Sequence, residues 1–188
     1  MIKHILTLSL LVFYLLGSSQ SNSKLPELDK SSMDVSYYPN NYPILKIQNK
    51  VTESLVARVI YSRPSKQGRK IFGELVEYGK VWRFGANEAT EIEFFSDVKI
   101  DGKKVSRGRY SLYAIVNEKS WTLIVNKDTD VWGAFKYDSK KDVVRLELPV
   151  EKTEEVVDAL AMVFEKSTTG INLIVAWEQV RVTIPISL

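Results

Sequence analysis

Hydrophobic and polar residues alternate along most of the chain from residue 42 onward, which is typical of strands with one buried face. Near the C-terminal end, for example, Val182 and Ile184 share one face while Arg181 and Thr183 share the other. Asp101-Gly102 is a strong signal for a tight hairpin turn. The pattern predicts about nine strands, drawn from ten candidate segments at residues 51–62, 90–95, 97–100, 103–106, 109–116, 121–126, 143–150, 158–165, 171–178 and 179–186.

Short strands at close spacing, without an amphipathic helix of normal length, indicate an all-β protein. We expect an antiparallel β-sandwich with one long irregular loop. A closed β-barrel is the alternative, because alternation is the same in both architectures. Residues 70–78 and 152–157 each have room for one helical turn. Pro185 lacks a backbone N–H, so the last strand is expected to lie at a sheet edge or to turn this position outward.

The alternation breaks over residues 61–90, which hold four of the nine glycines together with three arginines. A long segment of this composition between strands is more often a functional loop than a simple connector. A second irregular segment, residues 128–139, contains Trp132 and Phe135. We therefore expect a binding site to be formed by these two segments.

Composition excludes several kinds of chemistry. The formal net charge of +3 is too small to predict a nucleic-acid partner. There is no cysteine, and the only histidine, His4, lies in the N-terminal segment. Elsewhere the chain therefore has no disulfide, no Cys–His or Ser–His–Asp catalytic site and no zinc or haem site that needs these ligands. Asp128 and Asp130 lack the spacing of a calcium loop, so we expect no metal and no cofactor.

The N-terminal segment has the layout of an export signal. Lys3 and His4 precede an apolar stretch over residues 5–16, and small residues follow at 17–19. The apolar stretch is short for a membrane span, although an uncleaved anchor is the alternative. We predict a signal peptide at 1–19, a polar linker at 20–41 and one domain at 42–188, in a protein exported to the periplasm or cell envelope or secreted. The mature chain is expected to have no membrane span. The sequence pattern makes no prediction about the oligomeric state.

The long loop also carries a family resemblance. Its blocks are Tyr61-Ser62-Arg63-Pro64, Gly68-Arg69, Ile71-Phe72-Gly73, Tyr78-Gly79, Val81-Trp82-Arg83 and Gly85-Ala86-Asn87-Glu88-Ala89-Thr90. Further blocks follow in order at Gly108 to Leu112, Trp121, Asn126-Lys127-Asp128, Trp132 to Phe135, Tyr137-Asp138 and Ala176-Trp177-Glu178. The chain resembles a bacterial family of exported proteins known as domain of unknown function 2911. The resemblance implies an exported β-rich domain, and it implies no established activity.

Two positions depart from the family pattern. Phe84 stands where a small hydroxyl residue is usual, and Glu77 stands where proline is frequent. A phenylalanine cannot hydrogen-bond a ligand, so the resemblance assigns no binding role to position 84.

The arginines of the loop, Arg63, Arg69 and Arg83, form the first candidate site. Guanidinium groups bind carboxylate, sulfate or phosphate through paired hydrogen bonds. Tyr78 or Trp82 would add a stacking face for a sugar ring or base. The alternative is that each arginine pairs with a glutamate, at position 74, 77, 88 or 91, and fixes the loop to the sandwich.

Asn87 and Glu88 form the second candidate, as a turn amide and a general acid or base. A glycosidase would need a second carboxylate at the correct separation, and a turn followed by a solvated strand face is the simpler interpretation. Trp121 and Trp177 end or begin alternating apolar faces, so we predict that they lie in the core. Trp132 is in a glycine-containing loop and is the better candidate for an exposed aromatic group.

These observations lead to one main hypothesis and two alternatives. The main hypothesis is a binding module for a small polar ligand, anionic or carbohydrate, in a cleft between the two irregular segments. The first alternative is a carboxylate-based hydrolase that uses Glu88. The second is a structural or interaction protein of the cell envelope.

Overall fold

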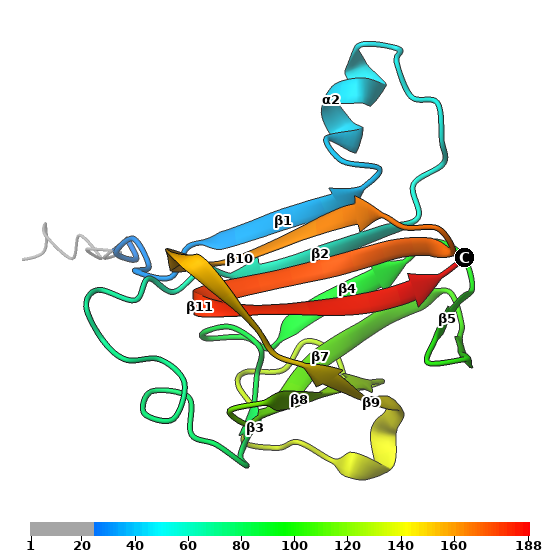
Figure 1. Cartoon of the computed structure of the whole chain (residues 1–188). Helices are drawn as coiled ribbons and strands as arrows, with labels where there is room; N and C mark the ends of the chain where they lie inside the picture. The colour runs from blue at the N-terminus through cyan, green and yellow to red at the C-terminus, as the bar shows by residue number, and fades with distance from the viewer. Residues whose placement is uncertain (1–24) are drawn as a thin grey trace, which may run out of the picture.

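The computed structural model of the chain describes residues 25–188, which form two antiparallel β-sheets packed against each other (Figure 1). The predicted signal peptide, at 1–19, and the first residues of the predicted linker lie outside the described residues. The sheets do not join into a barrel, so the sandwich prediction is confirmed and the closed β-barrel alternative is wrong. No helix within residues 25–188 is long and apolar enough to cross a membrane.

The larger sheet has the strand order β1-β2-β4-β7-β8-β9, and β3 pairs with β7 beyond the end of β4. The strands of this sheet are β1 (Met33–Tyr38), β2 (Ala57–Ser62), β3 (Val81–Trp82), β4 (Thr90–Phe94), β7 (Gly108–Val116), β8 (Ser120–Asn126) and β9 (Asp142–Pro149). The smaller sheet has the order β10-β11-β5-β6. Its strands are β5 (Val98–Ile100), β6 (Lys103–Val105), β10 (Glu151–Lys166) and β11 (Gly170–Ser187).

Most predicted strands are present, and the predicted hairpin joins β5 to β6. Asp101 and Gly102 both have positive φ, 52° and 70°, as a tight two-residue turn requires. The C-terminal strands are longer than predicted. Residues 171–178 and 179–186 belong to one strand, β11, and the helical turn expected at 152–157 is part of β10. Pro185 is exposed in the part of β11 that has no pairing with β10, which fits its missing N–H.

Two N-terminal elements differ from the predictions. Residues 33–38 were predicted to be part of a polar linker, but they form β1, which pairs with β2 from Met33↔Ser62 to Tyr38↔Ala57. The domain therefore begins before residue 42. The strand-like pattern predicted from residue 42 is also wrong at its start, because Tyr42–Ile47 is a short helix, α2, with Pro43 in its first turn. Helix α2 has no buried residue and stands away from the sandwich (Figure 1).

The core lies between the sheets and is made by the inward faces of both. Trp121 from β8 and Trp177 from β11 are both buried there, which confirms the core prediction for these two residues. The 3₁₀ helix η1 (Ser139–Lys141) leads into β9, and residues 128–138 cover the outer face of the larger sheet. On that face Tyr113 and Ile124 form a second, smaller buried cluster.

One long side of the sandwich is closed by a seam between the end of β2 and β10. The amide of Leu160 donates to the carbonyl of Pro64, and the amide of Lys66 donates to the carbonyl of Asp158. The buried hydroxyl of Tyr61 accepts from the Met162 amide at 3.0 Å. Burial raises the pKa of the Tyr61 hydroxyl, so it remains a neutral partner for the backbone. The edge of β10 is thus satisfied by the neighbouring sheet and is closed to further strand pairing.

Replacing Tyr61 by phenylalanine tests this seam. The buried Met162 amide would lose its acceptor, so we expect Tyr61→Phe to lower the free energy of unfolding by about 1–3 kcal/mol. The measurement is urea unfolding followed by circular dichroism. Tyr38→Phe is the matched control, because Tyr38 is also buried but its hydroxyl makes no hydrogen bond within residues 25–188. Equal effects of the two substitutions would show that the Tyr61 hydroxyl does not hold the seam.

Candidate functional site

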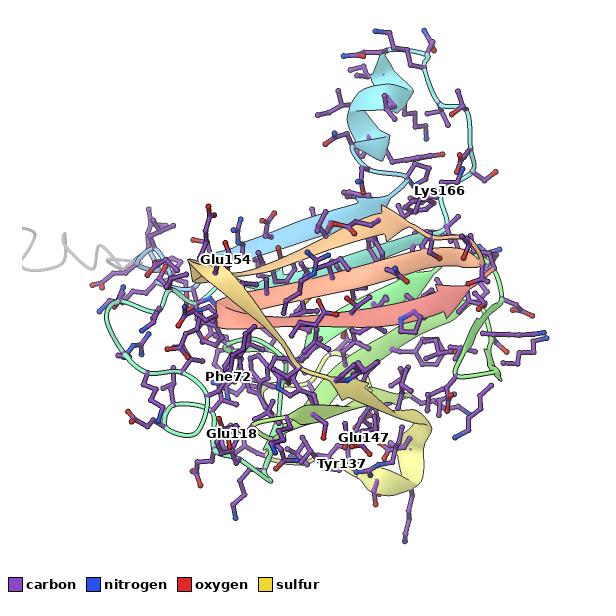
Figure 2. All side chains as sticks on the ribbon, viewed as in Figure 1. Phe72, Glu118, Tyr137, Glu147, Glu154 and Lys166 are labelled. Carbon is purple, nitrogen blue, oxygen red and sulfur yellow. The ribbon has the colours of Figure 1, made fainter. Side chains whose placement is uncertain are left out.

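The long loop between β2 and β4 packs into the core at one end of the sandwich. It contributes Phe72, Trp82 and Phe84 to an aromatic cluster completed by Trp121 and Trp177. The ring centroids of Phe72 and Trp121 are 5.0 Å apart, and those of Trp82 and Phe84 are 5.4 Å apart. The side chain of Phe72 lies beside the strands at this end of the molecule (Figure 2). The loop is therefore part of the hydrophobic core as well as a surface segment.

Trp82 is mainly a core residue. Strand β3 pairs Trp82 with Ala114 of β7, which turns the indole inward. The ring is 8% exposed and lies 6.1 Å from the ring of Trp177, with an angle of 21° between the ring planes. Its Nε1 donates to the carbonyl of Gly85 at 3.0 Å. Both faces are thus largely covered, so Trp82 forms a wall of the site and not the open stacking platform that its place in the loop suggested.

Residues 84–87 have a strained backbone that packing holds in place. Phe84 and Asn87 have φ values of 61° and 58°, in the left-handed region of the backbone that residues other than glycine rarely adopt. The Phe84 ring is 1% exposed, and the Phe84 carbonyl accepts from the hydroxyl of Thr90 at 2.8 Å. A Cβ on Gly85 would lie 3.1 Å from that hydroxyl, so a larger residue would have to displace the Thr90 side chain slightly. Strained residues of this kind are frequent at binding sites.

A cleft of about 310 Å³ opens beside this strained turn, and we name it the arginine cleft. Its polar side is formed by Arg69, Arg83 and Asn87, and its apolar side by Val76, Trp82 and Trp177. Four of the predicted site residues, Arg69, Trp82, Arg83 and Asn87, are therefore brought together. The lining within residues 25–188 contains two arginines and no aspartate or glutamate, so the cleft keeps a surplus of positive charge even with the Asp29 carboxylate at its rim.

Arg83 is the most distinctive group in the cleft. Its side chain is half-buried, and within residues 25–188 it forms no ion pair with a carboxylate. Its buried Nε makes no hydrogen bond in the same part of the chain. Arginine is charged at all physiological pH values, and buried polar groups normally have partners. An unpaired guanidinium in a cleft therefore has donors available for an anion.

Arg69 is fixed by the loop backbone. Its Nε donates to the carbonyl of Lys66 at 3.0 Å, and its Nη2 donates to the carbonyl of Ser65 at 2.6 Å. These two bonds use part of its donor set and leave other N–H groups of the fork free of protein partners within residues 25–188. Arg69 thus adds positive charge and further donors to the cleft, without a glutamate partner.

Asn87 joins the cleft to two other segments. Its side-chain amide donates to Asp29 Oδ2 at 2.9 Å, so the N-terminal segment lies against the rim of the cleft. Its backbone carbonyl accepts from the Gly133 amide at 2.9 Å, which connects the strained turn to the second irregular segment. Ser31, two residues after Asp29, also lines the cleft.

Glu178 holds the first half of the loop in place. It is a residue of β11 with a φ of 58°, it pairs with Val157 where the register of β10 shifts, and its carboxylate is largely covered. One carboxylate oxygen lies 3.2 Å from Lys66 Nζ, and the other accepts from the Ile71 amide at 3.3 Å. A left-handed conformation costs a non-glycine residue on the order of 1 kcal/mol, which these contacts offset. The sequence pattern contains no signal for this role.

The other predicted site residues lie elsewhere. Arg63 belongs to the seam, because its Nη1 pairs with Asp34 at 2.8 Å and its Nε donates to the Leu160 carbonyl at 3.0 Å. Tyr78 is exposed, and its ring lies against Gly73. Glu88 is exposed and forms a backbone bridge with Trp132, which lines a separate hollow. The predicted single cleft between the two irregular segments is therefore two hollows.

The predicted arginine–glutamate pairing within the loop is also wrong. Arg63 pairs with an aspartate of β1, and none of the three arginines pairs with Glu74, Glu77, Glu88 or Glu91 within the described residues. Glu74 lies near Lys70 and Glu91 near Arg109. Residues 25–188 contain no group of three or more acidic or histidine side chains placed to hold a metal ion.

The fold and the cleft define a two-sheet β-sandwich protein with a positively charged cleft at one end of its core. The chain belongs to the family described as protein of unknown function (DUF2911), whose model matches residues 43–186. This confirms the resemblance carried by the loop and by the later blocks. Comparison with curated proteins finds no match, and comparison with solved structures finds none either.

The contact of Glu178 with the loop can be tested by hydrogen exchange. In Glu178→Ala the Ile71 amide loses its acceptor and Lys66 loses its ion pair, so exchange at Ile71 should become faster by about tenfold. Glu165→Ala is the control, because Glu165 is an exposed glutamate of β10 whose partner is Arg181. If both variants leave the exchange of Ile71 unchanged, Glu178 does not hold the loop.

Proposed function

We propose that this protein is an exported binding module for a small anionic ligand, which it holds in the arginine cleft. The observation that carries the proposal is the half-buried Arg83, which lines the cleft and whose charge has no counter-ion within residues 25–188. A carboxylate, sulfate or phosphate at its Nη groups would supply that counter-ion. Arg69 adds a second positive charge, and the Asn87 amide, which donates one hydrogen to Asp29, has a second hydrogen to donate.

The dimensions of the cleft support a small ligand. A volume of about 310 Å³ is at the lower end of the range for small-molecule sites. The apolar wall of Val76, Trp82 and Trp177 would face the carbon skeleton of the ligand, while the polar wall binds its charge. A uronic acid has both parts, because its ring carries an apolar C–H face and a single carboxylate. Sulfated sugars and small organic phosphates share this chemistry.

The groups in the cleft favour binding over hydrolysis. The residues within 25–188 that line the cleft include no carboxylate to act as a general acid or base, and the Asp29 carboxylate at its rim is hydrogen-bonded to Asn87. Glu88 is exposed and is not among the residues that line the arginine cleft. A hydrolase that uses Glu88 therefore gains no support from this arrangement.

The compartment is part of the same proposal. The N-terminal pattern of residues 1–19 supports export, and a chain without cysteine is unaffected by an oxidising compartment. In the periplasm, in the cell envelope or outside the cell, the protein would meet acidic saccharides and other small anions in solution.

Substitution of Arg83 tests the ligand class. Glucuronate, galacturonate, a sulfated monosaccharide and phosphate serve as probes in isothermal titration. We expect at least one probe to bind, and Arg83→Ala to weaken it by about 10- to 100-fold because charge-assisted hydrogen bonds are lost. The affinity of Arg83→Lys should lie between those of the unsubstituted protein and Arg83→Ala, since lysine keeps the charge but lacks the planar guanidinium fork.

Arg107→Ala is the matched control. It removes the same charge from an exposed position in the turn before β7, so it should leave the affinity unchanged. The proposal is wrong if no probe binds, or if the affinity of the probe that binds is the same with Arg83→Ala. Equal weakening by Arg83→Ala and Arg107→Ala would indicate a general charge effect without a site.

The pH dependence provides a second test. Arginine as a residue type is charged at every physiological pH, and the only histidine, His4, lies in the predicted signal peptide. Affinity for a uronate should therefore be constant from about pH 6 to about pH 9, and it should fall below about pH 4 as the ligand carboxylate takes up a proton. A clear change of affinity between neutral and alkaline pH would mean that a titrating side chain, and not the arginines, dominates binding.

A further inference from the structure

A second hollow lies on the outer face of the larger sheet and has a different character. Its volume is about 440 Å³, and it is formed by residues 130–137 over Tyr113 of β7. Four of its lining side chains are aromatic: Tyr113, Trp132, Phe135 and Tyr137. We name it the aromatic hollow. Within residues 25–188, the aromatic hollow and the arginine cleft have no lining residue in common.

Two of these aromatic rings are exposed to an unusual degree. Trp132 is 62% exposed and Phe135 is 82% exposed, whereas the other three tryptophans of the chain are buried. A large aromatic ring left in water forgoes the stabilisation that burial would provide. Neither ring contributes to a hydrophobic core of residues 25–188, so folding alone does not account for them.

The exposed rings are nevertheless held in place. Gly133 has a φ of 67°, and a Cβ on it would lie 2.8 Å from the Phe135 ring, so that ring rests directly on the glycine backbone. Trp132 forms a backbone bridge with Glu88, and the Val131 carbonyl accepts from the Ala89 amide at 3.0 Å. The backbone that carries the two exposed rings is therefore fixed, so a ligand that contacts them would not have to order it.

The base of the hollow is also fixed and uncharged. The Tyr137 hydroxyl donates to Asp142 Oδ2 at 2.6 Å, and its ring packs edge-on against Tyr113 with centroids 5.1 Å apart. Burial, together with the hydrogen bond to Asp142, raises the pKa of Tyr137 to about 12. Tyr137 therefore remains neutral at every physiological pH. In Figure 2 its side chain lies beneath β9, away from Phe72 and the aromatic core.

We propose that the aromatic hollow binds a neutral sugar ring of a saccharide, stacked on Trp132 and Phe135. The C–H face of a pyranose is apolar and packs on aromatic rings, while its hydroxyl groups bind polar groups at the rim. Lys136 supplies a donor, and the Asp130 carboxylate oxygen that is not bonded to Arg109 and Thr129 supplies an acceptor. This site is independent of the arginine cleft and of the anionic ligand proposed there.

Two other occupants fit the hollow less well. A quaternary ammonium ion would stack on the rings, but the exposed Lys136 repels it, and the carboxylate of Asp130 is already paired with Arg109. A protein partner would need a contact area of about 800 Å² from each side, far larger than a single hollow with two exposed rings. A neutral ligand of monosaccharide size is consistent with the charge and with the volume.

Tryptophan fluorescence tests the proposal directly. Trp132 is the one exposed tryptophan of the chain, so iodide should quench mainly its emission. Cellohexaose, maltohexaose, xylohexaose and chitotetraose serve as probes, each titrated into the full protein in the presence of iodide. We expect at least one of them to protect Trp132 from quenching. Trp132→Phe gives the background from the three buried tryptophans.

Variants then identify the site. Phe135→Ala keeps the Trp132 fluorescence signal and should weaken binding of the protecting saccharide by about tenfold. Trp132→Ala should weaken binding by the same amount, measured by isothermal titration. Gly133→Ala should also weaken it, because the added methyl displaces the Phe135 ring. Ile47→Ala is the control, since Ile47 is an equally exposed apolar residue on α2 and should have no effect. Circular dichroism establishes that each variant is folded.

Three results would overturn the proposal. The first is that none of the four saccharides protects Trp132. The second is that choline protects Trp132 and the saccharides do not, which would identify a cation site. The third is that protection appears without ligand as the protein concentration rises, which would identify the hollow as a contact between copies of the chain.

Discussion

Packing of aromatic rings between the sheets determines both the fold at one end of the sandwich and the position of the arginine cleft. Trp121 comes from the larger sheet and Trp177 from the smaller one, while the long loop contributes three further rings. Burial of each such ring contributes about 2–3 kcal/mol, so the loop is held by forces of the same kind as the strands. Without those rings this end of the core would be open to water.

The same packing explains why a strained turn persists next to a charged cleft. The buried ring of Phe84 and its carbonyl bond to Thr90 fix the turn, even though Phe84 and Asn87 both have positive φ. Arg83 directly precedes Phe84, and Asn87 is itself one of the two residues with positive φ, so both reach the cleft from a rigid backbone. The Phe84 side chain fixes the turn from within the core and does not reach the cleft. This role accounts for a phenylalanine at position 84.

The alternating pattern was sufficient to predict the class of fold, because the side chains of each strand report on one buried face. It also placed Trp121 and Trp177 in the core. It failed for β1, where a six-residue strand lies between polar segments and is stabilised by its pairing with β2. It failed for α2, whose apolar residues resemble a strand but remain exposed. Such elements depend on contacts distant in sequence, which local periodicity does not contain.

The candidate site could be predicted only in part, again because contacts between residues distant in sequence decide which side chains are paired. The composition of the loop identified Arg69, Arg83 and Asn87, but it also included Arg63, whose partners are Asp34 and the carbonyl of Leu160 in other strands. An arginine that pairs within the protein and an arginine without a protein partner cannot be told apart in the sequence. The carboxylate of Glu178 had no local signal at all, because its partners Lys66 and Ile71 are more than a hundred residues away.

The two hollows are separate in their side chains but connected through the backbone. The Gly133 amide bonds to the Asn87 carbonyl, and the Ala89 amide bonds to the Val131 carbonyl, so the strained turn and the aromatic segment form one short ladder. A shift of either segment would break hydrogen bonds to the other, which costs about 1 kcal/mol for each bond. The ladder therefore fixes the position of the arginine cleft relative to the aromatic hollow.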